Sequence, residues 1–255
     1  MMDVSQSLDA KAPPPVFDVR SLKVSYGKFE AVKGVSFTVE RGEIFALVGE
    51  SGSGKSTIAK ALVGLEKPSG GEIVRDPSCV VQMVFQDATG SLNPRMTVRQ
   101  TLEEAVKVRK TGRDAKALLR QVGLSEAVLG QYPREMSGGQ CQRISIARAL
   151  AAGGDVLVAD EPVSALDVSV QARVLNLLRD LRRELGLTII LIVHDLAVVK
   201  NVCDRVAVME HGRFVDFGDS SHVFEHPTSD YTRRLLAAVP DVRKSLTGRF
   251  PGKML

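Results

Sequence analysis

Hydrophobic and polar residues alternate with a period of two near the start of the chain, from Val16 to Glu43, with turn residues at Tyr26-Gly27 and Arg41-Gly42. This alternation is typical of antiparallel strands. Farther along, apolar runs predict buried strands over 44–48, 156–159 and 188–193. Weaker patterns predict a strand-rich stretch over 70–85 and a hairpin made of 206–209 and 213–217.

Between these strands the hydrophobic period changes to that of a helix. Helices are predicted over 97–110, 113–122, 137–152, 168–185, 196–203 and 229–239. Ser137 has the side chain of an N-cap residue, and Gly123 and Gly153 stand where helices often end. Because a block of helices interrupts an alternation of strands and helices, we predict an α/β protein with a helical insertion.

Composition and charge narrow the class of protein. The 255 residues carry a formal net charge of +4. The basic cluster from Arg179 to Arg183 contains Asp180, so it indicates a solvated helix face and not a nucleic-acid site. No apolar run approaches the roughly 18 residues of a membrane span, and Met1 to Lys11 has no signal-peptide core, so we expect a cytoplasmic chain. The cysteines lack metal-ligand spacing and are expected to be reduced packing residues: Cys79, Cys141 and Cys203.

One segment carries most of the functional information. It follows the apolar run 44–48 and reads Gly49-Glu50-Ser51-Gly52-Ser53-Gly54-Lys55-Ser56, a complete G-x-x-x-x-G-K-[ST] phosphate-binding loop, or P-loop. Its glycines let backbone N–H groups wrap a phosphate chain at a helix start. Lys55 can reach the β- and γ-phosphates of ATP, and the Ser56 hydroxyl can bind Mg²⁺. Thr57 is assigned to the same nucleotide site.

A second nucleotide element ends the apolar run 156–159 with the carboxylates of Asp160 and Glu161. In open parallel sheets, ligands bind at the carboxyl ends of the strands. We therefore expect Asp160 to hold Mg²⁺, directly or through water, and Glu161 to polarise an attacking water as general base.

A third element, Ser137-Gly138-Gly139-Gln140, is a second anion-binding nest at a helix start. One nucleotide does not need two nests from one chain, whereas two chains arranged head to tail would each supply one nest to a shared nucleotide. With the P-loop, Asp160-Glu161 and His194, this segment resembles the nucleotide-binding subunits of ABC transporters, whose signature reads L-S-G-G-Q. Met136 replaces the leucine here, which conserves volume.

The resemblance implies a fold and a domain organisation. The fold would be a P-loop NTPase of ABC type, with a mixed-sheet core, an antiparallel β subdomain and an inserted α-helical subdomain. The ATPase domain would cover 16–240, with the catalytic core at 16–87 and 155–240 and the helical signature subdomain at 88–154. A mobile tail is expected over 1–15, and 241–255 would form a C-terminal tail.

The resemblance also assigns roles to residues that carry little information alone. Tyr26 is expected to stack on adenine, Gln86 to reach Mg²⁺ or the lytic water, and His194 to contact the γ-phosphate. Ser164 to Asp167 resembles the D-loop that communicates between two chains, and Asp167 is assigned to the nucleotide site.

Two segments resemble one subgroup, the ATPases of dipeptide, oligopeptide and nickel importers. Residues 91–98 match its S-L-N-P-x-M-T-V segment, and 226–240 matches its H-P-Y-T-x-x-L-L-x-A-V-P tail with Thr228 to Asp230 inserted. The short stretch 71–81 and the end at Leu255 suit compact members that serve nickel, metal-chelate or opine uptake as well as peptides.

The segment 91–98 also bears on partners. In the resembled family this region receives a cytoplasmic helix of a membrane permease. We expect its apolar residues to lie at the surface for that contact, the alternative being that they pack inward: Leu92, Met96 and Val98.

These observations lead to a functional hypothesis. The chain would bind and hydrolyse ATP with Mg²⁺ and energise an importer of peptides, nickel or metal-chelate and opine-type solutes. Its partners would be a second ATPase subunit, either a sister chain or a copy of itself, two permeases and indirectly a solute-binding protein, but no nucleic acid. It would sit on the cytoplasmic face of the membrane. The alternative is a soluble ATPase subunit of a metabolic complex, such as a carbon–phosphorus lyase assembly.

Overall fold

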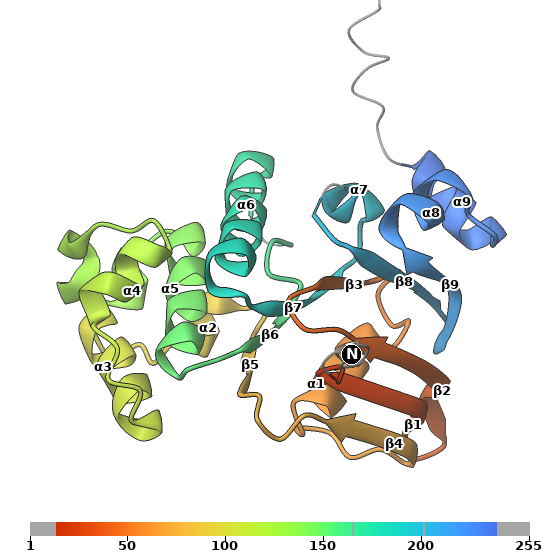
Figure 1. Ribbon diagram of the computed structural model, residues 1–255. Coiled ribbons are helices and arrows are strands. Elements are labelled where there is room, and N and C mark those ends of the chain that lie inside the picture. Colours follow the sequence, from red (N-terminus) through yellow and green to blue (C-terminus); the bar gives the residue numbers. More distant parts are fainter. Residues whose placement is uncertain (1–13, 165, 201, 239–255) are drawn as a thin grey trace, which may run out of the picture.

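A computed structural model describes residues 14–164, 166–200 and 202–238 of the chain. Figure 1 shows two sheets at the centre, with one group of helices beside the mixed sheet and shorter helices near the C-terminal end. Apart from residues 14 and 15, the two predicted tails lie outside the described residues. Within the described part of the chain, no helix combines the length and apolarity needed to cross a membrane.

The first sheet is antiparallel, as the period-two pattern predicts. Its strand order is β2-β1-β4, and its strands are β1 (Phe17–Tyr26), β2 (Phe29–Val39) and β4 (Gly70–Arg75). Along β1 the buried side chains switch from odd to even positions, with Val19 buried and then Leu22. A register irregularity between these two residues, next to Ser21 at φ +48°, allows the switch.

The second sheet is mixed and has the order β5-β6-β7-β3-β8-β9. All its neighbouring pairs are parallel except β8 and β9. Its strands are β3 (Ile44–Val48), β5 (Val81–Val84), β6 (Val156–Asp160), β7 (Thr188–Val193), β8 (Arg205–Glu210) and β9 (Arg213–Asp219). Every residue of β3, β6 and β7 is buried, because helices or the other sheet cover both faces of these central strands.

The predicted helical insertion is present between β5 and β6. It contains α2 (Ala88–Ser91), α3 (Val98–Arg109), α4 (Ala115–Gln121), two 3₁₀ turns (Glu126–Gly130 and Pro133–Glu135) and α5 (Gly138–Ala151). The other helices are α1 (Lys55–Leu62), α6 (Val168–Leu185), α7 (Leu196–Val199), α8 (Ser220–Glu225) and α9 (Asp230–Ala237). The helix predicted over 196–203 is therefore too long, since α7 ends at Val199, and α8 has no counterpart in the sequence-based prediction.

Alternate side chains of β3 point into two hydrophobic cores. Ile44, Ala46 and Val48 pack with the helices of the insertion and with α6. Phe45 and Leu47 pack with the antiparallel sheet and α1. The P-loop therefore starts from a strand that is fixed on both sides, as a rigid phosphate-binding site requires.

One expectation about the segment 91–98 is wrong. Leu92 and Val98 are only 3% and 2% exposed and belong to the core of the helical insertion, while Met96 is half-buried. The reason is local: a capping box between Thr97 and Gln100 starts α3 at Val98, and Val98 then packs into that core.

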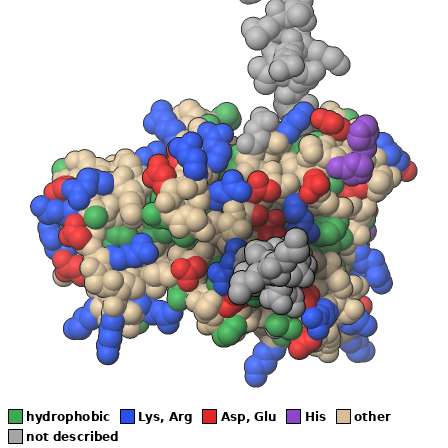
Figure 2. Space-filling model, in the orientation of Figure 1, with side chains coloured by type: hydrophobic (Ala, Val, Ile, Leu, Met, Phe, Trp, Pro, Cys, Tyr) green, Lys and Arg blue, Asp and Glu red, His purple; other side chains and the backbone are tan. Residues whose placement is uncertain are grey.

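Charged side chains of both signs share the visible face of the molecule. Figure 2 shows Lys and Arg scattered among Asp and Glu. In the basic cluster 179–183, Arg183 pairs with Asp180 at 3.3 Å, and Arg182 pairs with Asp204 at 3.2 Å. These contacts agree with a solvated helix face. The three cysteines are buried and free, as expected.

Candidate functional site

The P-loop joins the end of β3 to the start of α1. Two of its glycines have no room for a side chain. A Cβ on Gly49, at φ +153°, would overlap the carbonyl oxygen of Met209, and a Cβ on Gly54, at φ +110°, would lie 2.5 Å from that of Ala31. The glycines thus allow the loop to close against β8 and β2.

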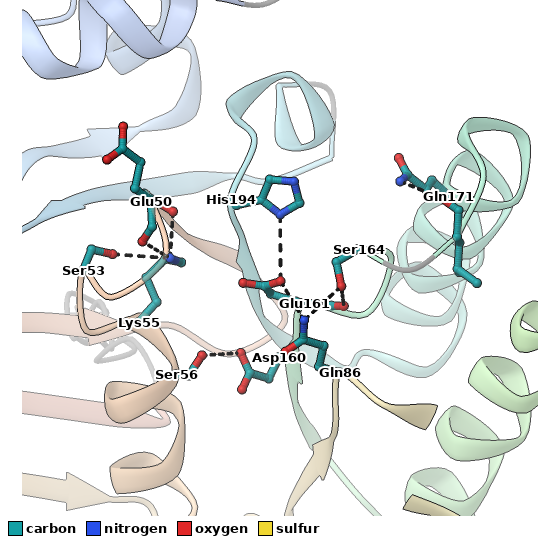
Figure 3. A network of polar contacts seen from close by, with 12 residues as sticks. Glu50, Ser53, Lys55, Ser56, Gln86, Asp160, Glu161, Ser164, Gln171 and His194 are labelled. Atoms are coloured by element: carbon teal, nitrogen blue, oxygen red, sulfur yellow. Dashed lines mark hydrogen bonds and ion pairs between the residues drawn. The ribbon is translucent and has the colours of Figure 1, made fainter. Parts of the chain in front are cut away.

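Lys55, the first residue of α1, is folded back into the loop (Figure 3). Its ammonium donates to the carbonyl oxygens of Gly49 and Glu50 at 2.7 and 2.8 Å, and to Ser53 Oγ at 3.3 Å. The side chain is 3% exposed, and this burial lowers the Lys55 pKa, although nearby carboxylates oppose the shift. A cation held inside a loop of backbone amides is suited to bind an anion such as phosphate.

Ser56 and Asp160 meet beside the P-loop. Ser56 Oγ donates to Asp160 Oδ1 at 2.9 Å, which brings the first turn of α1 to the carboxyl end of β6. Asp160 is buried, which raises the pKa of its carboxyl. Two oxygen donors at this spacing fit Mg²⁺, which prefers oxygen ligands and is usually held by one or two carboxylates together with phosphates.

Glu161 lies at the centre of a second group of polar side chains (Figure 3). Gln86 Nε2 donates to its Oε2 at 3.2 Å, and His194 Nδ1 lies 3.9 Å from the same oxygen. Ser164 Oγ donates to the Glu161 carbonyl oxygen at 3.1 Å. Three of these residues follow the parallel strands β5, β6 and β7, so the sheet itself brings them together.

A cavity of about 320 Å³ connects the P-loop with this group. It is lined by Tyr26, Phe29, Ala31, Ser51, Gly52, Gly54, Lys55, Ser56, Thr57, Gln86 and Glu161. His194 lines an adjoining cavity of about 70 Å³ that also contains Glu161. Nine of the predicted site residues thus line one cavity, and His194 lines the adjoining one.

Two exposed aromatic rings also line the cavity. Tyr26 is 45% exposed and its hydroxyl donates to Glu66 at 3.0 Å, so the phenol is held at the rim. Phe29 is 63% exposed and was missed by the sequence analysis. The available signal was a large apolar residue two positions after Gly27, at the same turn as Tyr26.

Ser137 to Gln140 does not reach this cavity. Ser137 caps α5: its Oγ accepts from Gln140 N at 3.3 Å, while Gln140 Oε1 accepts from Ser137 N at 2.9 Å. The segment contributes nothing to the cavity lining, whereas Gly138 lines a separate cavity of about 270 Å³ beside Leu166. Figure 1 shows α5 and α1 on different sides of the mixed sheet.

Asp167 also lies away from the cavity lining. It is the N-cap of α6, and its Oδ1 accepts from Val170 N at 3.0 Å and from Ser169 Oγ at 2.8 Å. The neighbouring Val168 is 82% exposed.

Comparisons with known proteins agree with this geometry. The sequence model of the ABC transporter family matches residues 32–164. The oligopeptide transport ATP-binding protein AmiF of Streptococcus pneumoniae is 43% identical over 249 residues, covering 88% of this chain and 81% of the relative. The oligopeptide transport ATP-binding protein OppF of Salmonella typhimurium is 45% identical over 232 residues, covering 83% of this chain and 70% of the relative.

A solved structure gives the same fold. The ATP-binding cassette MJ0796, described as a dimer in a post-hydrolysis state bound to ADP and Pi, superposes with a TM-score of 0.70 at 26% identity, covering 80% of this chain and 98% of its own. The α/β fold with its antiparallel sheet and inserted helices is therefore that of an ABC-type P-loop ATPase. On its sequence, its fold and its nucleotide site, this chain belongs to the ABC transporter family.

Proposed function

We propose that this chain is the ATP-hydrolysing subunit of a membrane importer whose solutes are peptides. One observation carries the ATPase part of the proposal: Lys55 and Glu161 line one cavity, and Asp160 is hydrogen-bonded to Ser56 in its lining. The peptide part rests on AmiF and OppF, which are named as oligopeptide transport proteins. Neither of these two relatives carries a nickel or opine name, and both are transport proteins, which favours an importer over a lyase complex.

The residues divide the work of hydrolysis among them. The P-loop amides and Lys55 bind the β- and γ-phosphates, with Lys55 exchanging its present carbonyl partners for phosphate oxygens. Ser56, Asp160 and the amide oxygen of Gln86 would hold Mg²⁺, which offsets negative charge on the phosphates when bound. Tyr26 stacks on adenine, and Phe29 adds a second apolar wall.

Glu161 is the proposed general base. Its carboxylate lies at the junction of the two cavities, next to His194 on one side and Gln86 on the other. A carboxylate at this place can accept a proton from water while His194 contacts the γ-phosphate. The amide of Gln86 can orient the same water, since it is within hydrogen-bond distance of the base.

We propose that the functional unit is a head-to-tail dimer. Ser137 to Gln140, with Asp167, would complete the nucleotide site of the opposite subunit, because within one chain none of them lines the P-loop cavity. The related cassette MJ0796 is described as dimeric, which supports this arrangement. The partner is either a sister chain or a second copy of this chain. The dimer would lie at the cytoplasmic face of the membrane, beneath two permeases.

We propose that the permeases contact a groove beside Gln86 and not the segment 91–98. A groove of about 390 Å³ runs between β5, α3 and α5, and its lining includes Phe85, Val108, Glu104 and Arg148. Phe85 and Val108 are 38% and 72% exposed. Exposed apolar residues between side chains of opposite charge suit an amphipathic helix, such as one from a permease.

Reconstitution tests the proposal. The chain, its partner ATPase and the two permeases, co-purified and placed in proteoliposomes with a solute-binding protein, should take up labelled oligopeptides only when ATP is supplied. The matched assay uses ⁶³Ni²⁺ as the solute. Uptake of nickel without uptake of peptides would reject the peptide assignment. Co-purification of the chain in an ATP-hydrolysing complex that contains no permease would favour the metabolic alternative.

A further inference from the structure

The backbone of the P-loop is held by two later segments of the chain, α9 and the turn between β8 and β9. The backbone N–H of Glu50 donates to the hydroxyl of Tyr231, on α9, at 2.9 Å. The N–H of Gly212, in the turn between β8 and β9, donates to the carbonyl oxygen of Ser53 at 3.0 Å. Two backbone groups of the loop thus depend on residues that lie far away in sequence.

The position of Tyr231 is itself well defined. Its side chain is 6% exposed, and its ring lies 5.9 Å from the guanidinium carbon of Arg234. Ser229 caps α9, with Ser229 Oγ accepting from Thr232 N at 3.0 Å. A phenol this buried, one residue inside the first turn of a capped helix, has little freedom to turn away from the loop.

The segment before α9 is anchored to the mixed sheet by one carboxylate. Asp216, on β9, accepts from the backbone N–H groups of Thr228 and Ser229 at 2.9 and 3.0 Å, and from the Thr228 hydroxyl. Thr228 and Ser229 therefore supply contacts that anchor the start of α9, and with it Tyr231, beside the P-loop.

Two side chains, Lys55 and Tyr231, hydrogen-bond to the backbone of Glu50, and a bound phosphate would affect these two contacts differently. Lys55 holds the Glu50 carbonyl oxygen from inside the loop, at 2.8 Å, where a phosphate would compete for the ammonium. The Tyr231 hydroxyl holds the Glu50 N–H, and Tyr231 does not line the P-loop cavity, so a phosphate in that cavity does not compete with it. When Lys55 turns to a phosphate, the Tyr231 hydroxyl remains to fix this peptide.

We propose that Tyr231 is a positioning residue of the nucleotide site. Its hydroxyl holds the Glu50 peptide in the conformation in which the P-loop binds phosphate. The inference rests on the nucleotide binding in the proposed function. Because coupling free energies are reciprocal, nucleotide in the P-loop must in turn stabilise the docking of α9.

The affinity test uses Tyr231→Phe in the full-length chain. This change removes one hydroxyl and keeps the ring, so the Kd for MgADP, measured by titration calorimetry, should rise about two- to tenfold, the range expected for one hydrogen bond. Tyr132→Phe is the matched control, because Tyr132 lies in the helical insertion, outside the P-loop cavity. It should leave the Kd unchanged.

Hydrogen exchange separates positioning from general destabilisation. In the unmodified chain, MgADP should slow amide exchange in α9 as well as in the P-loop. In Tyr231→Phe, protection of the P-loop should remain and the nucleotide-dependent protection of α9 should disappear. The measurement on the unmodified chain stands even if the variant is poorly folded.

The outcomes are distinct. An unchanged Kd in Tyr231→Phe, or exchange in α9 that does not respond to MgADP in the unmodified chain, overturns the role of Tyr231 and leaves the proposed ATPase intact. Failure of the unmodified chain to bind MgADP removes both.

Discussion

At the residue scale, Glu161 shows how backbone conformation serves chemistry. Its φ of +45° is in the left-handed region, which a non-glycine residue adopts at a cost. Its N–H donates to Ile192 O at 3.0 Å and its carbonyl oxygen accepts from Ser164 Oγ, so both backbone groups are fixed by neighbours. The strained turn at the end of β6 directs the carboxylate toward Gln86 and His194.

The variant Glu161→Gln should slow ATP hydrolysis on the order of 10²-fold or more and leave MgATP binding intact, because the amide cannot accept the proton while Ser56 and Asp160 remain. Phosphate release in the reconstituted complex, with calorimetry for affinity, measures both effects. Glu103→Gln, which removes an exposed carboxylate paired with Arg99 on α3, is the control and should behave normally. Near-normal turnover in Glu161→Gln would exclude it as the base.

At the element scale, the first turn of α5 carries two roles in the same residues. Ser137 caps the helix and is also the residue proposed to face the nucleotide of the opposite subunit. A substitution there changes helix stability and the composite site together, so the two effects must be separated by design.

Ser137→Ala and Ser137→Arg make that separation. Both lose the cap, at a cost of about 1 kcal/mol in the free energy of unfolding. The arginine variant alone places a bulky cation in the nest, so its hydrolysis should fall far below that of the alanine variant, while ATP binding to its own P-loop survives in both. Equal losses of turnover in the two variants would reject the trans role of this segment.

The anchoring of α9 by Asp216 predicts a dependence on pH. Burial by itself raises the Asp216 pKa, but hydrogen bonds from Thr228, Thr232 and Ser229 outweigh it and hold the pKa at about 2. A depressed native pKa means that the stabilisation is fully present above the unfolded value near 4 and is lost as the pH falls through about 2.

Asp216→Asn should therefore lower the free energy of unfolding by about 1–3 kcal/mol at pH 7, the range for hydrogen bonds to a charged group. Denaturation of both proteins from pH 7 to pH 2 should show a constant difference down to about pH 4 and a shrinking one below it. Asp219→Asn, on the same strand, is the comparison. If the difference in the free energy of unfolding between the two proteins is unchanged at pH 2, the negative charge of Asp216 is not what stabilises the fold.

At the scale of the whole molecule, the mixed sheet organises two surfaces. The carboxyl ends of its strands gather the nucleotide site. The groove beside β5 lies next to Gln86, which contacts Glu161, so a partner in the groove would be one residue away from the proposed base. This short path gives the proposed permease contact a route to catalysis.

Val108→Asp should weaken association with the permeases and abolish uptake, because it places a charge among the apolar residues of the groove. ATP binding by the separate chain should be unchanged, since Val108 is 72% exposed and outside both nucleotide cavities. Val74→Asp, at a 43% exposed position of β4, is the control. Normal co-purification and uptake in Val108→Asp would remove the groove from the interface.

The sequence by itself determined what local chemistry can specify. The P-loop follows from a strand, a glycine-rich turn and a helix start that are contiguous in the chain. The N-cap at Ser137, the helix over 168–185 and the strand over 188–193 follow in the same way from short-range patterns. The motifs that carry the family resemblance are also local segments, and the comparisons confirm that resemblance.

Tertiary structure decided what depends on residues distant in sequence. Glu161, Gln86 and His194 meet only because β5, β6 and β7 are neighbours in one sheet. Leu92 and Val98 were expected at the surface, yet the core of the helical insertion buries them. The contact between Tyr231 and Glu50 joins residues 181 positions apart, and no periodicity or motif encodes such a contact, because it depends on how whole elements pack.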